Sequence, residues 1–135
     1  MTLEETIAGR GHENVLAAHE STLEVTTDDW LTPAGDCIVG VEADRAPADF
    51  DAAFVEACRR PETRIEVTLG AGGVTDRVVA SGHPDLTFES ERSLVCRTSR
   101  YVDDRTVAVG ADAAAADLDR ELVAALARGA ELEVT

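Results

Sequence analysis

The chain has 135 residues, with 27 acidic residues against 12 basic ones, all of them arginine, and a formal net charge of −15. In dilute buffer such a charge strains a fold by self-repulsion, whereas molar salt shortens the Debye length to about 3 Å and screens it. The composition therefore favours one domain of a cytoplasmic protein in a salt-adapted organism over an acidic surface that docks a basic partner.

The sequence contains an internal repeat, in which residues 3–69 return as residues 74–135. Gly11-His12 returns as Gly82-His83, "GDCIVGVEAD" as "DDRTVAVGAD", "ADFDAAFVEACRR" as "ADLDRELVAALAR" and "IEVT" as "LEVT". Self-similarity of this length indicates one supersecondary unit used twice. One unit has little core of its own, so we predict a single domain, 1–135, in which the two units bury their apolar faces together.

Each repeat reads as strand, strand, strand, helix, strand. The alternation in 21–27 and 64–70 is typical of strands with one buried and one solvated face. Residues 37–43 ("CIVGVEA") and 106–112 ("TVAVGAD") are more continuously apolar, which predicts central strands. The "GAGG" turn at 70–73 is too short for a linker. The last strand of the first repeat is therefore expected to form a hairpin with the first strand of the second.

Apolar residues at three- and four-residue spacing predict one buried stripe on the helix of each repeat. The stripes are Phe50, Phe54, Ala57 and Cys58, and Leu118, Leu122, Ala125 and Leu126. Asp49 and Asp117 are the predicted N-caps, and Gly129 suits the position after a helix end. We predict an α+β fold, a β-β-β-α-β unit duplicated with pseudo-twofold symmetry. It forms a mostly antiparallel sheet or a partly closed barrel with two helices against it.

The three cysteines, Cys37, Cys58 and Cys96, form an odd set without CxxC spacing. Two fall in predicted strands and one on a helix stripe, so we expect small buried thiols and no metal or nucleophilic role. No nucleotide or metal motif occurs, and we predict no cofactor.

The histidines are the first candidates for chemistry. His12 and His83 occupy the same place in the two repeats, so a pair near a twofold axis could share a metal or an anion, and His19 adds a third imidazole. No zinc-type spacing such as HExxH accompanies them. A His that follows Gly at a strand end is also a plain structural choice, in which the imidazole donates to a neighbouring carbonyl, and we favour this interpretation.

Carboxylates at strand ends are the second set. Asp36 and Asp44 bracket a strand, and Asp104 and Asp112 repeat them. Such groups bind divalent cations or act as general bases. His12, His83, Asp44 and Asp112 are thus the candidate metal ligands, and His12, His19, Asp36 and His83 the candidate catalytic groups. Asp residues beside turns and helices also cap the backbone, and repetition in both copies favours that role.

The repeats differ most between their second and third strands. The second repeat gathers Arg92, Arg97, Arg100, Tyr101 and Arg105, which could bind an anion or stack single-stranded nucleic acid. The favoured alternative is a row of arginines bridging nearby carboxylates. The first repeat has the only tryptophan, Trp30, which we expect to close a loop over the core.

Three stretches together, "GRGHENV…AHESTLEVT", "LTPAGDCIVGVEAD" and "ADLDRELVAAL", resemble an archaeal family known as domain of unknown function three-seventy-one. The resemblance covers nearly the whole chain, and the "GDCIVGV" block is its most specific part. It implies an archaeal, haloarchaeal and cytoplasmic protein, and it implies no activity. The second repeat has Asp103-Asp104 in place of the Gly-Asp turn, so any role of that turn belongs to the first repeat.

Three functions remain open at this point. The first is a non-enzymatic module that binds a ligand or partner at the junction of the repeats, where His12, His19 and Asp36 could meet the second repeat. The second is a small metal-assisted or acid–base enzyme that uses those groups. The third is nucleic-acid binding through the arginines. No apolar run reaches membrane-spanning length and no signal-peptide pattern begins the chain, so we expect no membrane partner; the sequence assigns no other partner and no oligomeric state.

Overall fold

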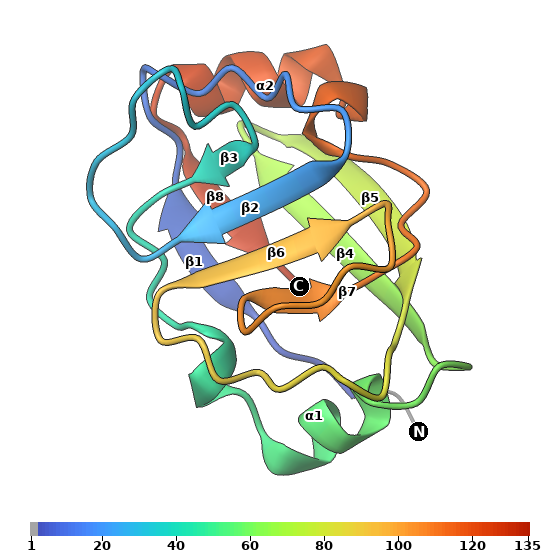
Figure 1. The fold of residues 1–135 in the computed structure, drawn as a ribbon. Helices are drawn as coiled ribbons and strands as arrows, with labels where there is room; N and C mark the ends of the chain where they lie inside the picture. Colours follow the sequence, from blue (N-terminus) through green and yellow to red (C-terminus); the bar gives the residue numbers. More distant parts are fainter. Residues whose placement is uncertain (1–2) are drawn as a thin grey trace.

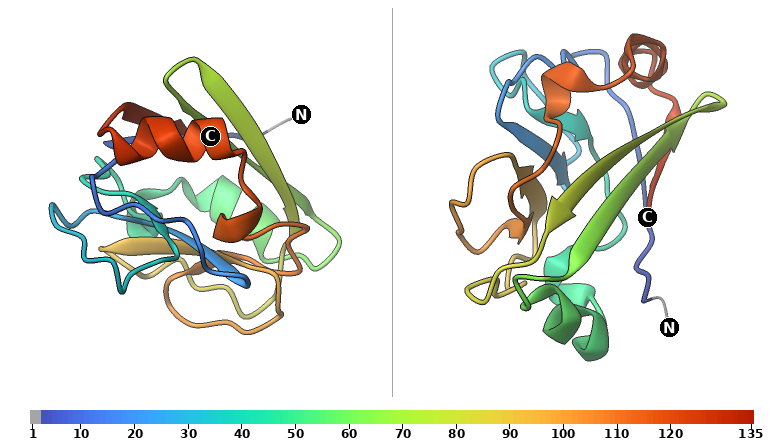
Figure 2. Two further views of the ribbon diagram at one scale, coloured as in Figure 1. Left: turned by 90° about the horizontal axis from the view of Figure 1, so that it is seen from above. Right: turned by 90° about the vertical axis from the view of Figure 1, so that its right-hand side faces the viewer.

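The computed structural model describes residues 3–135. Two four-stranded sheets pack face to face, with one short helix at each end of the molecule (Figures 1 and 2). The strands are β1 (Ile7–Arg10), β2 (Thr22–Thr26), β3 (Ile38–Gly40), β4 (Arg64–Ala71), β5 (Val74–Ser81), β6 (Ser93–Arg97), β7 (Thr106–Ala108) and β8 (Glu131–Val134). The helices are α1 (Ala52–Cys58) and α2 (Arg120–Ala127), each preceded by a 3-10 turn, η1 (Pro47–Asp49) and η2 (Ala115–Asp117).

Both sheets contain strands from both repeats. The first has the order β1-β8-β4-β5 and the second β3-β2-β6-β7, so exchanging the repeats maps each sheet onto itself. At the centre of the first sheet Thr68 and Thr135, equivalent residues of the two repeats, exchange two main-chain hydrogen bonds of 2.8 and 3.0 Å. The predicted α+β fold with a pseudo-twofold duplication is confirmed, and both sheets are open, which removes the barrel alternative.

The hairpin between the repeats is also confirmed. β4 and β5 pair along their whole length, and only Gly72 and Gly73 separate Ala71 from Val74. Both glycines have positive φ values, 58° and 79°, as the two central residues of a type I′ hairpin turn require. The turn chemistry therefore joins the repeats by continuous pairing.

The prediction of two central strands was wrong. β3 and β7 are the edge strands of the second sheet, and each runs parallel to its neighbour, β2 or β6. Their buried, continuously apolar sequences reflect loops and helices packed around them. Val41, for example, is buried just beyond β3 and exchanges main-chain hydrogen bonds with Arg10 of β1 in the other sheet.

The helix N-caps lie two residues later than predicted. Asp51 and Asp119 accept the cap hydrogen bonds, from the N–H groups of Ala53 and Glu121. Asp49 and Asp117 instead close the preceding 3-10 turns, where their carboxylates accept main-chain N–H groups. Gly129 follows α2 with a φ of 81°, in agreement with its predicted place after the helix end.

Each Gly-His pair lies where a strand end meets the last turn of a helix. A Cβ on Gly11 would stand 1.9 Å from the Leu126 carbonyl of α2, and one on Gly82 would stand 2.2 Å from the Cys58 carbonyl of α1. Only glycine permits this approach of backbone to backbone. The repeated glycines are therefore a packing requirement of the fold.

Candidate functional site

The structure separates His12 from His83. His12 follows β1 beside the end of α2, whereas His83 donates its main-chain N–H to the Cys58 carbonyl at the end of α1, and the two helices lie at opposite ends (Figure 1). Each imidazole Nδ1 accepts a main-chain N–H at 3.0 Å, from Asn14 and Asp85 respectively. The pair therefore serves two equivalent turns and does not converge.

Asp44 and Asp112 are likewise occupied by the fold. The carboxylate of Asp44 accepts the N–H of Ala8 and that of Asp112 accepts the N–H of Val79, both at 2.9 Å. They fasten equivalent loops to β1 and β5. Across residues 3–135, no three His, Cys, Asp or Glu side chains are arranged to hold a metal ion.

The structure brings His19 and Asp36 together through their main chains. The Asp36 carbonyl accepts the N–H of His19, and His19 Nδ1 accepts the N–H groups of Ser21 and Thr22 at 3.2 and 3.1 Å. In the second repeat Ser90 Oγ accepts the corresponding N–H groups of Arg92 and Ser93. The His19 imidazole thus has the same role as the Ser90 hydroxyl of the other repeat, which is to accept two main-chain N–H groups of its turn.

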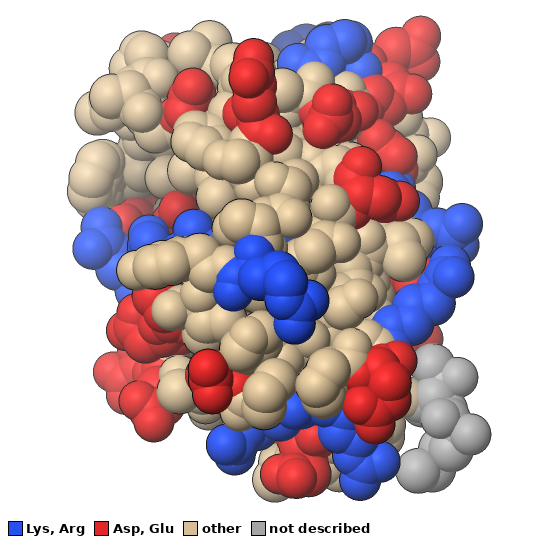
Figure 3. Space-filling view, turned by 45° about the vertical axis from the view of Figure 1, so that its right-hand side comes forward, with Lys and Arg blue, Asp and Glu red and all other residues tan. Residues whose placement is uncertain are grey.

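Three of the four arginines in the predicted basic stretch are held by carboxylates. Arg92 bonds Asp28 at 2.6 Å, and Arg97 and Arg105 both bond Asp103, at 2.9 and 3.0 Å. The hydrogen bond from Arg92 lowers the pKa of Asp28. The face drawn in Figure 3 carries both acidic and basic side chains, separated by uncharged surface. The stretch therefore carries little uncompensated positive charge.

The remaining members of that stretch border an open hollow of about 490 Å³. Arg100 has no ion pair among the described residues, and the ring of Tyr101, 62% exposed, lies 4.9 Å below the guanidinium of Arg97. Asp85, Asp103 and Asp104 also line the hollow. This acidic lining does not favour a polyanion. Trp30 is 56% exposed, and its neighbour Leu31 covers the core in its place.

The three thiols have raised pKa values. Cys58 and Cys96 are buried, as predicted, and burial raises their pKa values to about 11 and about 12. Cys37 is half-buried, and its pKa is raised chiefly by burial and by the charge of Glu24. At neutral pH all three remain protonated, which is the unreactive form.

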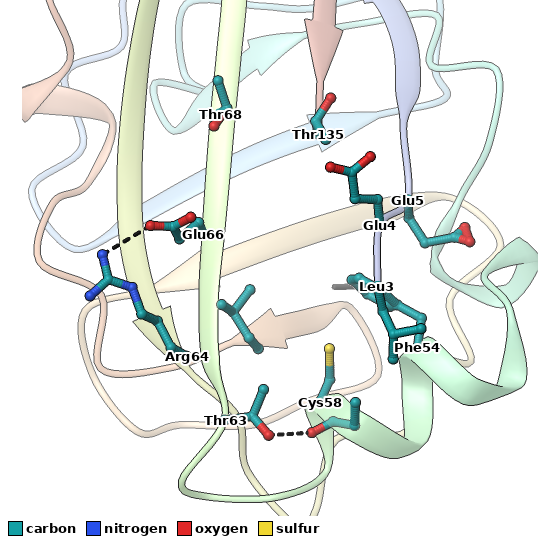
Figure 4. Close-up of a pocket in the computed structure, with 12 residues that line it drawn as sticks. Leu3, Glu4, Glu5, Phe54, Cys58, Thr63, Arg64, Glu66, Thr68 and Thr135 are labelled. Carbon is teal, nitrogen blue, oxygen red and sulfur yellow. Dashed lines mark hydrogen bonds and ion pairs between the residues drawn. The ribbon is translucent and has the colours of Figure 1, made fainter. Parts of the chain in front are cut away.

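A cleft lined by residues that were not among the predicted site residues opens beside α1, and we call it the α1 cleft. It has a volume of about 430 Å³ and lies between the segment Leu3–Glu5 and the start of β4, with Thr135 at its closed end (Figure 4). Phe54 and Cys58 of α1 form its base, and Glu4 and Glu66 stand on opposite sides.

An apolar cavity of about 50 Å³ adjoins the α1 cleft and shares Glu5, Phe54, Ile65, Glu66 and Thr135 with it. Apart from Glu5, Glu66 and Thr135, its lining is apolar and comes from both sheets and from α1: Ile7, Phe50, Phe54, Ile65, Val67, Leu94, Val107 and Val134. An apolar cavity of this kind offers no partners to water and readily accepts an apolar group. Among the sites described, this one combines an open cleft with an unfilled apolar interior.

The cleft had a signal in the sequence. The alignment of the repeats pairs Thr68 with Thr135, and beyond Thr68 the residues Leu69, Gly70 and Ala71 continue β4 to the hairpin turn. The place related to this segment by the pseudo-twofold axis is where the cleft lies. Side-chain chemistry alone does not reveal the cleft, because its lining mixes apolar, acidic and hydroxyl residues without a catalytic or metal-binding pattern.

Fold and site together define a small α+β protein, built from two interleaved β-β-β-α-β repeats, with a cleft at one end. The chain belongs to the family described as Domain of unknown function (DUF371), whose model matches residues 7–135. It is 39% identical over 130 residues to an uncharacterized protein, MJ0206, of Methanocaldococcus jannaschii, with 96% of each chain covered. The resemblance inferred from the sequence is confirmed at the level of the family. Among the described residues, no helix has the length and apolarity to cross a membrane.

Proposed function

We propose that the protein is a non-enzymatic binding module and that the α1 cleft is its binding site. The observation that supports this most directly is the apolar cavity beneath the cleft. A well-packed interior leaves few such spaces, because unfilled apolar volume forfeits packing contacts. A ligand that places an apolar group there gains contacts that the free protein lacks.

The polar groups that suggested an enzyme support binding instead. His12, His19 and His83 each accept main-chain N–H groups through Nδ1, and Asp44 and Asp112 hold strands. Groups used in this way keep a fixed geometry but offer no pair of acid and base around a common substrate position. We therefore move the proposed site from the His19–Asp36 loops to the α1 cleft.

We also propose that the protein works in the cytoplasm of a salt-adapted archaeon. The support is the net charge of −15 without any lysine, together with the archaeal relative. The melting temperature should rise steeply between dilute buffer and molar potassium chloride as the repulsion is screened. A melting temperature independent of salt would contradict this setting.

The binding site is tested by an amide NMR titration of the ¹⁵N-labelled protein in molar potassium chloride with butylguanidinium, which joins an apolar chain to a cation. We expect shifts at Leu3–Glu5, at 64–66 and in α1. Residues 74–76 and 131–133, the equivalent positions in the other repeat, are the internal control. Shifts at the control positions alone, or at the His19 and Asp36 loops, would overturn the proposed site.

A further inference from the structure

The internal symmetry identifies what the α1 cleft fits. Beyond the central Thr68–Thr135 pair, on one side, Leu69, Gly70 and Ala71 continue β4 between β8 and β5. On the other side, at the positions related by the pseudo-twofold axis, lies the α1 cleft. The cleft is thus the counterpart of a place in the same molecule that holds three residues of extended chain.

The walls of the two places correspond residue by residue. Leu69 lies between Val134 and Asp76, Gly70 between Glu133 and Thr75, and Ala71 pairs with Val74. The equivalents of these neighbours in the other repeat line the α1 cleft or its cavity: Val67 and Glu5, Glu66 and Glu4, and Leu3. A segment in the cleft would therefore lie between β4 and the residues Leu3–Glu5 that precede β1, antiparallel to each.

The main chain of both walls is positioned for pairing. Because alternate residues of a strand direct their N–H and C=O to the same side, Glu66 faces the cleft as Thr68 faces Thr135. Glu5 and Leu3 line the opposite wall at the positions equivalent to Asp76 and Val74, which pair with Leu69 and Ala71 of β4 in the filled place. No main-chain pairing within residues 3–135 occupies this edge of Glu66.

The side-chain preferences follow from the same correspondence. The position equivalent to Leu69, which is fully buried, lies over the apolar cavity between Val67 and Glu5. A bound residue at the position equivalent to Gly70 would direct its side chain outward, between Glu4 and Glu66. Glu4 has no ion pair among the described residues, so a cation there meets an uncompensated carboxylate. The position equivalent to Ala71 faces inward beside Leu3 and Ile65 and takes a small residue.

We propose that the α1 cleft binds an extended segment of a partner polypeptide by strand addition, with the pattern apolar, basic, small. This rests on the proposed function, in which the α1 cleft is the binding site. Main-chain pairing with Glu66, Glu5 and Leu3 holds the segment, the apolar side chain fills the cavity, and the basic side chain lies between Glu4 and Glu66.

The test is an NMR titration in molar potassium chloride with the peptide acetyl-Leu-Arg-Ala-Thr-amide and with the same peptide N-methylated at its arginine. We expect the first to shift the amides of 3–5 and 64–66. The second cannot donate its N–H to the Glu66 carbonyl, and we expect binding about tenfold weaker, as for loss of one main-chain hydrogen bond.

The two proposals fail in different ways. If butylguanidinium binds the cleft while both peptides bind equally weakly or not at all, the site stands and strand addition is overturned. Equal, tight binding of both peptides also overturns strand addition, because the main chain then contributes nothing. If neither butylguanidinium nor peptide shifts the cleft residues, both proposals fall.

Glu4 tests the basic position. Glu4→Gln should weaken the arginine peptide about threefold, a modest effect because the carboxylate is exposed and salt screens it. The variant should bind a Leu-Ser-Ala-Thr peptide with the same affinity as the wild type. Glu133→Gln is the control, because it makes the same substitution at a carboxylate outside the α1 cleft, and it should change neither affinity. An equal loss for both peptides in Glu4→Gln would overturn the charge preference.

A short tail appended after Thr135 tests directly whether an extended segment with an apolar residue fills the α1 cleft. Adding Leu-Gly-Ala, the sequence that fills the equivalent place, should raise the melting temperature and abolish peptide binding, whereas a Gly-Asp-Gly tail should do neither. Equal behaviour of the two tails would contradict the inference, because it would mean that the cavity does not receive an apolar side chain from an added strand.

Discussion

The two helices occupy equivalent positions, yet α2 is buried against the sheets and α1 is only half covered. Leu118, Leu122 and Val123 at the α2 end are buried, whereas their equivalents at the α1 end, Phe50, Phe54 and Val55, remain partly exposed. The helices carry the same apolar pattern, so the difference comes from their neighbours. The α2 end has Leu69 of the continuous hairpin, and the α1 end has the cleft.

Truncating the two helices should give the largest contrast. Leu122→Ala should lower the free energy of unfolding by about 3 kcal/mol, because it opens a cavity in a filled core. Phe54→Ala removes a larger side chain but should lower it by only about 1.5 kcal/mol, since that ring already borders solvent and a cavity. Urea unfolding in molar potassium chloride measures both. Equal losses would mean that the two ends are packed alike.

Adding a methyl group at the paired glycines sharpens the same contrast. Gly11→Ala should cost about 3 kcal/mol, because the new Cβ meets the backbone of a buried helix. Gly82→Ala should cost about 1–2 kcal/mol, because α1 has room to shift toward the cleft. The measurement is again unfolding by urea, and a greater loss in Gly82→Ala would contradict the view that α1 is the adaptable helix.

The acid sensitivity of the two repeats should also differ. Burial opposes ionisation of Asp103, but hydrogen bonds from Arg105 and Thr106 outweigh it and lower its pKa from 3.8 to about 2. The lowered pKa stabilises the fold above pH 3.8, and this contribution is lost as the pH falls toward 2. Solvent screens the group, so the contribution is about 1 kcal/mol.

The variant Asp103→Asn isolates this effect. It should unfold more readily than the wild type at pH 6 and equally at pH 2, as followed by circular dichroism. The first repeat has Gly35 at the equivalent position, so it has no counterpart of the Asp103 carboxylate. A difference that grew toward low pH would have the wrong sign for a lowered pKa.

The smallest effect is expected at His19. His19→Ala should lower the free energy of unfolding by about 1 kcal/mol, as for loss of a turn acceptor. His19→Ser should stay within about 0.5 kcal/mol of the wild type, because Ser90 accepts the same pair of N–H groups in the other repeat. A large loss in His19→Ser, measured by urea unfolding, would show that the imidazole does more than serve its turn.

The order of elements and the hairpin could be predicted because duplication and turn chemistry are local signals. The edge position of β3 and β7 could not, because an apolar run reports burial and not the source of that burial. Asp49 and Asp51 are both acceptors near a helix start, so sequence alone could not decide which one caps α1. The polar candidates were visible as residues, but their main-chain partners depend on the tertiary fold.

The Gly72-Gly73 turn has a consequence for stoichiometry. Two separate copies of one repeat, joined about the same axis, would form a symmetric pair with two identical open grooves. Joining them through this turn threads the connecting chain, Leu69 to Ala71, through one groove and leaves the other open. The covalent link between the halves thus fills the first groove in every molecule, and the proposed strand addition at the α1 cleft predicts a stoichiometry of one peptide for each chain.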